Sequence, residues 1–216
     1  MIKYLTTLSF LYIFGLSVIA QKNEGYLEYV IDVQAIDTSL KARQQVGLLR
    51  NSSMKVFFMK DKSRLDFKMG EMYDITAIVD WKTNRSLSLF TTPKGKFATK
   101  MEAKQYKTSQ PTPDTTMRIE LTNETKKILN YTCKKAVLRS NNAEFIYWYT
   151  NEFSIDLKGQ SLVNSSIPGF PLEFQTIKDG ILMNFKVSNL IFKIENKNIL
   201  FSTVIPAGYT VIKDIQ

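Results

Sequence analysis

Apolar and polar residues alternate along most of the chain, which is the pattern of half-buried β-strands. The first such run, at 27–33, places on one face Leu27, Tyr29, Ile31 and Val33. The same alternation predicts strands at 54–60, 64–69, 73–80 and 85–91, then at 117–121, 131–139, 144–150, 171–178 and from 181 onward. The short connections exclude parallel crossovers within the first group. We therefore expect a mainly β fold built from an antiparallel meander.

The apolar face changes sides within residues 181–195. One parity holds Ile181, Met183, Phe185 and Val187, and the other holds Leu190, Phe192 and Ile194. This switch indicates a bulge or bend near Ser188-Asn189, or else a break between two strands there. Asp179-Gly180, just before the run, is typical of a tight hairpin turn. The pattern predicts a sheet curved into a half-barrel.

Two segments depart from the alternation. Residues 39–50 carry Leu40, Val46 and Leu49 at helical spacing, with Thr38 as the candidate N-cap, so a short helix is expected. Residues 103–116 are expected to form a loop, because they are polar and end with Pro111 and Pro113. The predicted fold is thus mainly β, of the α+β type: a curved antiparallel sheet, or half-barrel, with one or two short helices.

The first 20 residues have the organisation of a cleavable signal peptide. Lys3 precedes an apolar stretch at 8–19, and Val18 and Ala20 supply the small residues of a cleavage site. The stretch is shorter than the roughly 20 residues of a membrane span, which disfavours an uncleaved anchor helix. Gln21, not cysteine, follows the site, so no lipid attachment is expected. We expect a signal peptide at 1–20, one half-barrel domain at 21–216, and a periplasmic or secreted protein.

The chain is basic, with 29 Lys and Arg against 20 Asp and Glu and a formal net charge of +9. The densest lysine group, expected to be a solvated face or a mobile loop, contains Lys94, Lys96, Lys100, Lys104 and Lys107. Because the protein is expected to be exported, no nucleic-acid partner is predicted.

The chain contains no histidine and one cysteine. These counts exclude Ser–His–Asp triads, Cys–His pairs, histidine-containing zinc sites and an internal disulfide. We therefore predict a protein that is not an enzyme, without catalytic residues, metal or cofactor. Cys133 shares its parity with Tyr131 and Val137, so we expect a packed, unreactive thiol.

Several motifs occur together: NYTCKKA at 130–136, YWYT at 147–150, IPGFPLEF at 167–174 and VIPAGY at 204–209. With Arg64 and the strand end at 78–80, they resemble two related groups of exported Bacteroidota proteins that have no known activity. One group is named after its GLPGLI motif. The other, which the N-terminal part resembles more, is a domain of unknown function similar in fold to the LolA and LolB lipoprotein carriers. The resemblance implies an antiparallel half-barrel with a short helix over its concave side.

Methionines on strands suit an adaptable apolar surface. We therefore predict an apolar or lipid ligand in a concave pocket beneath the helix at 39–50, lined by Met54, Phe58, Met183 and Phe185. The expected partner is a lipid or lipoprotein, and the protein itself is not expected to be an integral membrane protein. One alternative is a structural or interaction protein of the cell envelope whose half-barrel is filled by its own side chains. Another is a hydrolase that uses carboxylates or a Ser–Lys pair. The sequence leaves the oligomeric state open.

Overall fold

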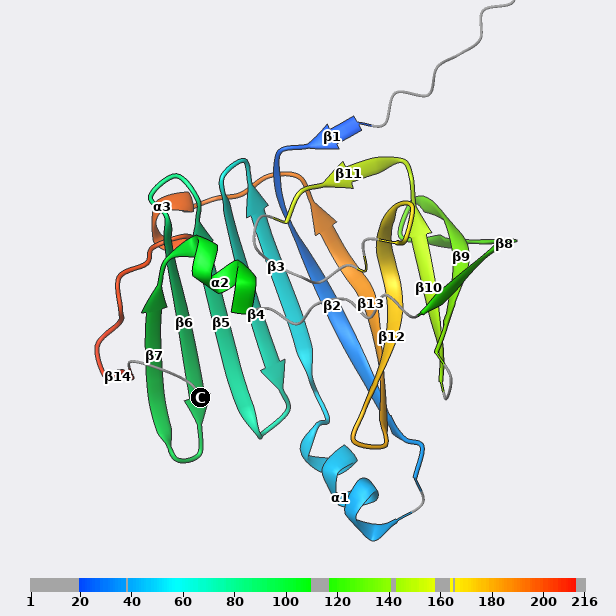
Figure 1. Cartoon of the computed structure of the whole chain (residues 1–216), viewed down its shortest axis with the longest axis horizontal. Coiled ribbons are helices and arrows are strands. Elements are labelled where there is room, and N and C mark those ends of the chain that lie inside the picture. Colours follow the sequence, from blue (N-terminus) through cyan, green and yellow to red (C-terminus); the bar gives the residue numbers. More distant parts are fainter. Residues whose placement is uncertain are drawn as a thin grey trace, which may run out of the picture.

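Twelve strands form one sheet in the computed structural model, which describes residues 20–37, 39–109, 117–140, 143–157, 164 and 166–212 (Figure 1). From edge to edge the order is β14 (Thr210–Val211), β7 (Gly95–Met101), β6 (Arg85–Thr92), β5 (Tyr73–Asp80), β4 (Lys62–Met69), β3 (Ser53–Met59), β2 (Glu24–Ala35), β13 (Ile181–Ile191), β12 (Phe170–Lys178), β10 (Glu144–Thr150), β9 (Tyr131–Arg139) and β8 (Arg118–Ile128). Apart from the parallel pair β14–β7, neighbouring strands are antiparallel. The predicted fold class is confirmed.

The sheet consists of two meanders that are joined by the pairing of β2 with β13. One meander runs from β2 to β7 and the other from β8 to β13. A separate parallel pair links β1 (Ala20–Lys22) with β11 (Phe153–Ile155). Of the predicted signal peptide, residues 1–19 lie outside the described residues, and Ala20 begins β1.

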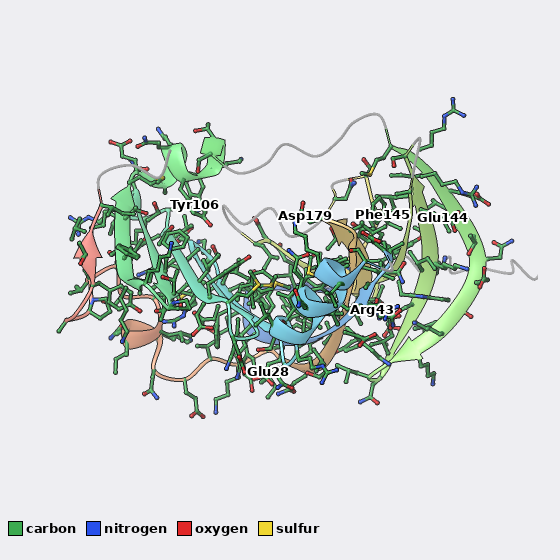
Figure 2. The ribbon with its side chains drawn as sticks, turned by 90° about the horizontal axis from the view of Figure 1, so that it is seen from below. Glu28, Arg43, Tyr106, Glu144, Phe145 and Asp179 are labelled. Atoms are coloured by element: carbon green, nitrogen blue, oxygen red, sulfur yellow. The ribbon has the colours of Figure 1, made fainter. Side chains whose placement is uncertain are left out.

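The switch of apolar face in the last long run is a β-bulge. β13 is continuous, and its register against β2 shifts between Val187 and Asn189, as the bulge interpretation predicted. Ser188 Oγ donates to the carbonyl of Glu28 at 3.2 Å. The hairpin at 179–180 is also confirmed, with φ of 52° at Asp179 and 74° at Gly180. A bulge increases local bending, and Figure 2 shows the sheet curved into a trough.

The concave face of the trough holds the largest cluster of buried side chains. It is formed by one face of β2, β3, β12 and β13 and includes Leu27, Tyr29, Ile31, Met54, Val56, Phe58, Leu172, Phe174, Ile181, Met183, Phe185 and Val187. The fully buried Tyr29 hydroxyl donates to the carbonyl of Pro171 at 3.1 Å, so its one polar atom is satisfied. Burial raises the pKa of Tyr29 far above its ordinary value.

The expected helix at 39–50 is α1 (Leu40–Leu48), which lies beyond the strand ends in Figure 1. Its N-cap is Ser39, whose hydroxyl accepts from the backbone N–H of Ala42 at 3.2 Å. The predicted cap, Thr38, lies outside the described residues. The C-terminal end is fixed by Glu71, whose N–H donates to the carbonyl of Leu48 at 2.9 Å.

The prediction of a loop over 103–116 is wrong for its first half, which forms α2 (Ala103–Ser109). Ala103 and Tyr106 are buried against Ala77 and Val79 of β5, an apolar pair at helical spacing. Residues 110–116 lie outside the described residues.

The lysine group at 94–107 lies on β7, its preceding turn and α2, with all five side chains exposed. It is therefore a solvated face of ordered elements, and the loop alternative is wrong for residues 95–109.

Candidate functional site

Three of the four predicted ligand-binding residues lie inside the concave core. Met54, Phe58 and Phe185 are 3%, 1% and 5% exposed. The Phe185 ring stacks on Phe174 with centroids 4.7 Å apart and on Phe67 at 6.2 Å. The protein's own aromatic rings therefore pack around the centre of the concave face.

The fourth residue, Met183, lies at the edge of this core and lines a pocket beneath α1. The pocket has a volume of about 170 Å³, and its other lining residues are Gln45, Leu49, Met69, Met72, Tyr73, Asp179 and Ile181. A cavity of roughly 150 Å³ accommodates a benzene-sized group, whereas sites for larger ligands occupy roughly 300–1,000 Å³. The pocket thus has room for the end of an apolar ligand.

A larger cleft, of about 530 Å³, lies on the opposite, outer face of the sheet. Its floor is a row of directly paired residues from four adjacent strands. Ile191 pairs with Tyr26, Tyr26 with Phe57, and Phe57 with Arg64. Paired residues project from the same side of a sheet, so the register alone brings these side chains together. The Tyr26 and Phe57 rings have centroids 5.5 Å apart and are tilted by 34°.

The wall of the cleft is the segment that follows β13, including α3 (Lys197–Leu200). The lining residues of this segment are Lys193, Ile194, Glu195, Asn196, Ile199 and Leu200. Its position is fixed by buried Phe201 and by an ion pair between Lys197 and Glu24. Gly25 permits the close approach of β13, because a Cβ there would lie 2.4 Å from the carbonyl oxygen of Ile191.

Arg64 connects the floor to the wall. Its Nε donates to both carboxylate oxygens of Asp66, at 3.0 and 2.9 Å, and its Nη1 donates to the carbonyl of Leu200 at 2.9 Å. Thr76 Oγ1 donates to Asp66 Oδ1 at 2.7 Å and holds the carboxylate in place. Within the described part of the chain, Nη2 has no hydrogen-bond acceptor, so its two N–H groups remain for a ligand.

The cleft combines both signs of charge with aromatic surface. Arg64 is balanced by Asp66, and Lys193 Nζ lies 3.8 Å from the carboxylate of Glu195. Asn196 adds an amide, which can both donate and accept. Such a surface suits a neutral ligand that has one apolar face and several hydroxyl or carbonyl groups.

The predicted burial of Cys133 is confirmed, since its thiol is 0% exposed. Burial raises the pKa of Cys133 to about 11, which keeps it a neutral thiol.

The described ranges contain no group of three or more His, Cys, Asp or Glu side chains placed to hold a metal ion. Nor does any helix in the described residues have the length and apolar character needed to span a membrane.

Sequence reasoning missed the outer cleft. Tyr26 and Phe57 lie on the more polar face of their strands, the face that also carries Glu28 and Lys55. Large aromatic residues on an otherwise polar face were the feature of the sequence that could have indicated the cleft. Only the family resemblance drew attention to Arg64. The wall was missed as well, because the alternation of Phe192 and Ile194 continues that of the preceding strand, whereas β13 ends at Ile191 and residues 197–200 form α3.

Comparison with known proteins finds a family similarity over residues 89–190. No curated protein matches the chain. Two crystal structures of PNGF-II match with a TM-score of 0.43 and identities of 18% and 17%, covering 88% of this chain. The matches cover 31% and 32% of PNGF-II, so this chain spans about a third of that protein's length.

A LolA superfamily protein from Nitrosomonas europaea matches at a TM-score of 0.24 and 9% identity, covering 85% of this chain and 92% of that one. TM-scores below 0.5 do not establish a common fold. Residues 89–190, just under half of the chain, match the family described as N-glycanase peptide, N-terminal domain. Over this segment, the chain is similar to the N-terminal domain of an N-glycanase.

Proposed function

We propose that this protein is an exported, non-catalytic binding module that holds a carbohydrate in the outer cleft. The observation that carries the proposal is the row from Ile191 to Arg64, where two adjacent rings lie beside a fixed guanidinium group. The apolar face of a sugar ring packs on aromatic side chains, while its hydroxyl groups need directed donors and acceptors.

Preorganisation of the cleft supports binding. The Arg64 side chain is already held by Asp66 and Leu200, so a ligand does not have to order it. The cleft volume of about 530 Å³ falls within the range of small-molecule sites. A disaccharide-sized segment of a longer glycan is a suitable occupant.

The family similarity supports the ligand class separately. The matching family is named for an N-glycanase, a glycan-related enzyme. The match covers residues 89–190, whereas Tyr26, Phe57 and Arg64 lie before it. The assignment of the cleft therefore depends on the chemistry of its side chains.

Titration calorimetry with free N-glycan oligosaccharides tests the proposal. We expect saturable binding whose affinity falls by roughly 5- to 150-fold in Phe57→Ala, since stacking of a ligand ring on an aromatic side chain is worth roughly 1–3 kcal/mol. The matched control is Phe90→Ala, another half-buried aromatic residue of the sheet that does not line the cleft. Equal losses in both variants, or no glycan binding at all, would contradict the cleft assignment. Release of glycan from a glycopeptide during the titration would contradict the non-catalytic assignment.

A second candidate function is binding of an apolar ligand beneath α1, as first predicted for the concave face. The observation that favours it is the convergence of Met69, Met72 and Met183 on one pocket. Native mass spectrometry of the exported protein would detect a retained lipid. For this candidate, Met183→Asp should abolish lipid retention, because it places a charge in an apolar site.

A further inference from the structure

Asn189 holds the hydroxyl group of Tyr26, a residue of the cleft floor. The bulge at Ser188 places Asn189 directly opposite Glu28, on the outer side of the sheet. Tyr26 lies two positions from Glu28 on β2, so Asn189 is diagonally across from it. The Nδ2 atom of Asn189 donates to the Tyr26 hydroxyl oxygen at 3.3 Å. The bulge in β13 therefore contributes to the site as well as to the curvature of the sheet.

This contact fixes the direction of the hydrogen bonds at Tyr26. An amide nitrogen only donates, whereas a phenolic hydroxyl accepts and also carries one donor hydrogen. Because Tyr26 accepts from Asn189, its own O–H remains to donate, and within the described ranges it has no acceptor. A ligand that covers Tyr26 has to supply an acceptor for this O–H, since a covered donor without a partner is costly.

Arg64, on the other side of Phe57, makes the same demand. Tyr26, Phe57 and Arg64 are direct cross-strand partners on three adjacent strands, so the tyrosine and the arginine flank the phenylalanine. The unpaired Nη2 of Arg64 carries two N–H groups and can only donate. The remaining side-chain acceptors that line the cleft, Glu195 and Asn196, belong to its wall. Both fixed polar groups beside the Phe57 ring are thus donors.

We infer that Asn189 is a positioning residue that sets the specificity of the outer cleft, which selects sugars by their hydrogen-bond acceptors. A sugar stacked on Phe57 satisfies Tyr26 and Arg64 with hydroxyl, ring or acetamido carbonyl oxygens. A protonated amino group has only donors, and it would lie beside the guanidinium charge. Neutral and N-acetylated sugars are therefore bound, and sugars with free amino groups are rejected. This inference rests on the proposed carbohydrate binding and adds to it which sugars the cleft accepts.

Titration calorimetry with three disaccharides of the same ring skeleton tests the selection. N,N′-diacetylchitobiose, cellobiose and free-amine chitobiose differ in one substituent on each ring, which is acetamido, hydroxyl or amino. In mildly acidic buffer, where the amines are protonated, we expect the first two to bind. The amine form should bind at least about tenfold more weakly, because it leaves donors of the cleft unpaired.

The failure of this selection can be told apart from the failure of carbohydrate binding. Equal affinities for the three disaccharides, with NMR shift changes at Phe57, would overturn the selection and leave carbohydrate binding in the cleft intact. Binding of N-glycan oligosaccharides without binding of any disaccharide would overturn the selection too. If neither the disaccharides nor the N-glycan oligosaccharides bind, the proposed function itself is wrong.

Asn189→Asp tests the role of the amide directly. Aspartate has nearly the same shape but only accepts, so the Tyr26 O–H turns toward it and no longer donates to the ligand. We expect the ratio of the two affinities, diacetylated over free amine, to fall at least about fivefold. A general loss of stability weakens both ligands alike and does not change this ratio. Tyr26→Phe, which keeps the ring and removes the O–H, should lower the ratio in the same way.

Two controls separate positioning of Tyr26 from the added negative charge. Asn123→Asp introduces the same charge at an exposed position of β8, a strand that contributes no residue to the cleft, and should leave the ratio unchanged. In the Tyr26→Phe background, Asn189→Asp should lower the ratio little further, because the hydroxyl through which it acts is absent. A further fall of the same size there, or an unchanged ratio in Asn189→Asp alone, would overturn the role of Asn189.

Discussion

Phe174 and Phe185 are direct partners across β12 and β13, and their rings stack with centroids 4.7 Å apart and planes within 5° of parallel. This stack lies at the centre of the concave core. Phe185→Ala should lower the free energy of unfolding by about 3–5 kcal/mol, because it removes a buried ring and leaves a cavity. Urea unfolding followed by circular dichroism measures the change. Phe57→Ala, on the outer face, should cost clearly less, and equal costs would contradict a filled concave core.

Gly70 should be far less tolerant of substitution than Gly47. Gly70 has a φ of +53°, and a Cβ there would lie 2.0 Å from the carbonyl oxygen of Leu48. Gly70→Ala should therefore destabilise the protein by more than about 1 kcal/mol. Gly47→Ala, in α1 with open space around it, should stabilise the helix by up to about 1 kcal/mol. Thermal unfolding of the two variants compares them, and a neutral Gly70→Ala would show that α1 is not seated as described.

Cys133 should resist thiol reagents at neutral pH, because burial raises its pKa from 9.0 to about 11. The unfolded chain ionises this thiol from about pH 9, while the folded protein retains the proton until about pH 11. The contribution of the Cys133 thiol to the free energy of unfolding is therefore fully present below pH 9 and is lost as the pH rises toward 11. The difference in unfolding free energy between the unmodified protein and Cys133→Ala, measured from about pH 8 to about pH 11, should shrink. Rapid labelling of the native protein at neutral pH would contradict the burial.

Arg64→Lys should loosen the wall of the outer cleft although it preserves the charge. A lysine cannot donate to Asp66 and to the Leu200 carbonyl at once with the geometry of a guanidinium. We expect a loss of roughly 1–2 kcal/mol in stability and faster amide hydrogen exchange at 198–201. Arg139→Lys is the control, since Arg139 forms exposed ion pairs with Glu120 and Glu144 that contribute little. Similar exchange at 198–201 in both variants would mean that Arg64 does not hold the wall.

Alternation in the sequence predicted strands such as β2, β3 and β13 because buried and more exposed residues alternate along them. It also located a bulge, a bend or a break near Ser188-Asn189, and the continuous strand β13 has a bulge there, between Val187 and Asn189. It failed for α2, whose only apolar signal is Ala103 and Tyr106, and for β7, where a cluster of lysines dominates the composition.

The cleft was less accessible to sequence reasoning than the core. Tyr26 and Arg64 are 38 positions apart in the chain, and only the registers of β2, β3 and β4 align them in one row. Met54, Phe58 and Phe185, which were predicted to line a ligand pocket, lie in one buried cluster, because alternation assigns them to the same face of the sheet. Alternation does not tell whether such a face is open or filled by its own side chains.

The most direct test of carbohydrate binding in the outer cleft is to map amide chemical-shift changes in NMR spectra as an N-glycan oligosaccharide is added. We predict shifts that concentrate at Tyr26, Phe57, Arg64 and residues 193–200, the floor and wall of the outer cleft. Amides around Met72 and Met183, beneath α1, should remain unchanged. Shifts that concentrate around Met183 instead, or spectra that do not change, would contradict binding in the outer cleft.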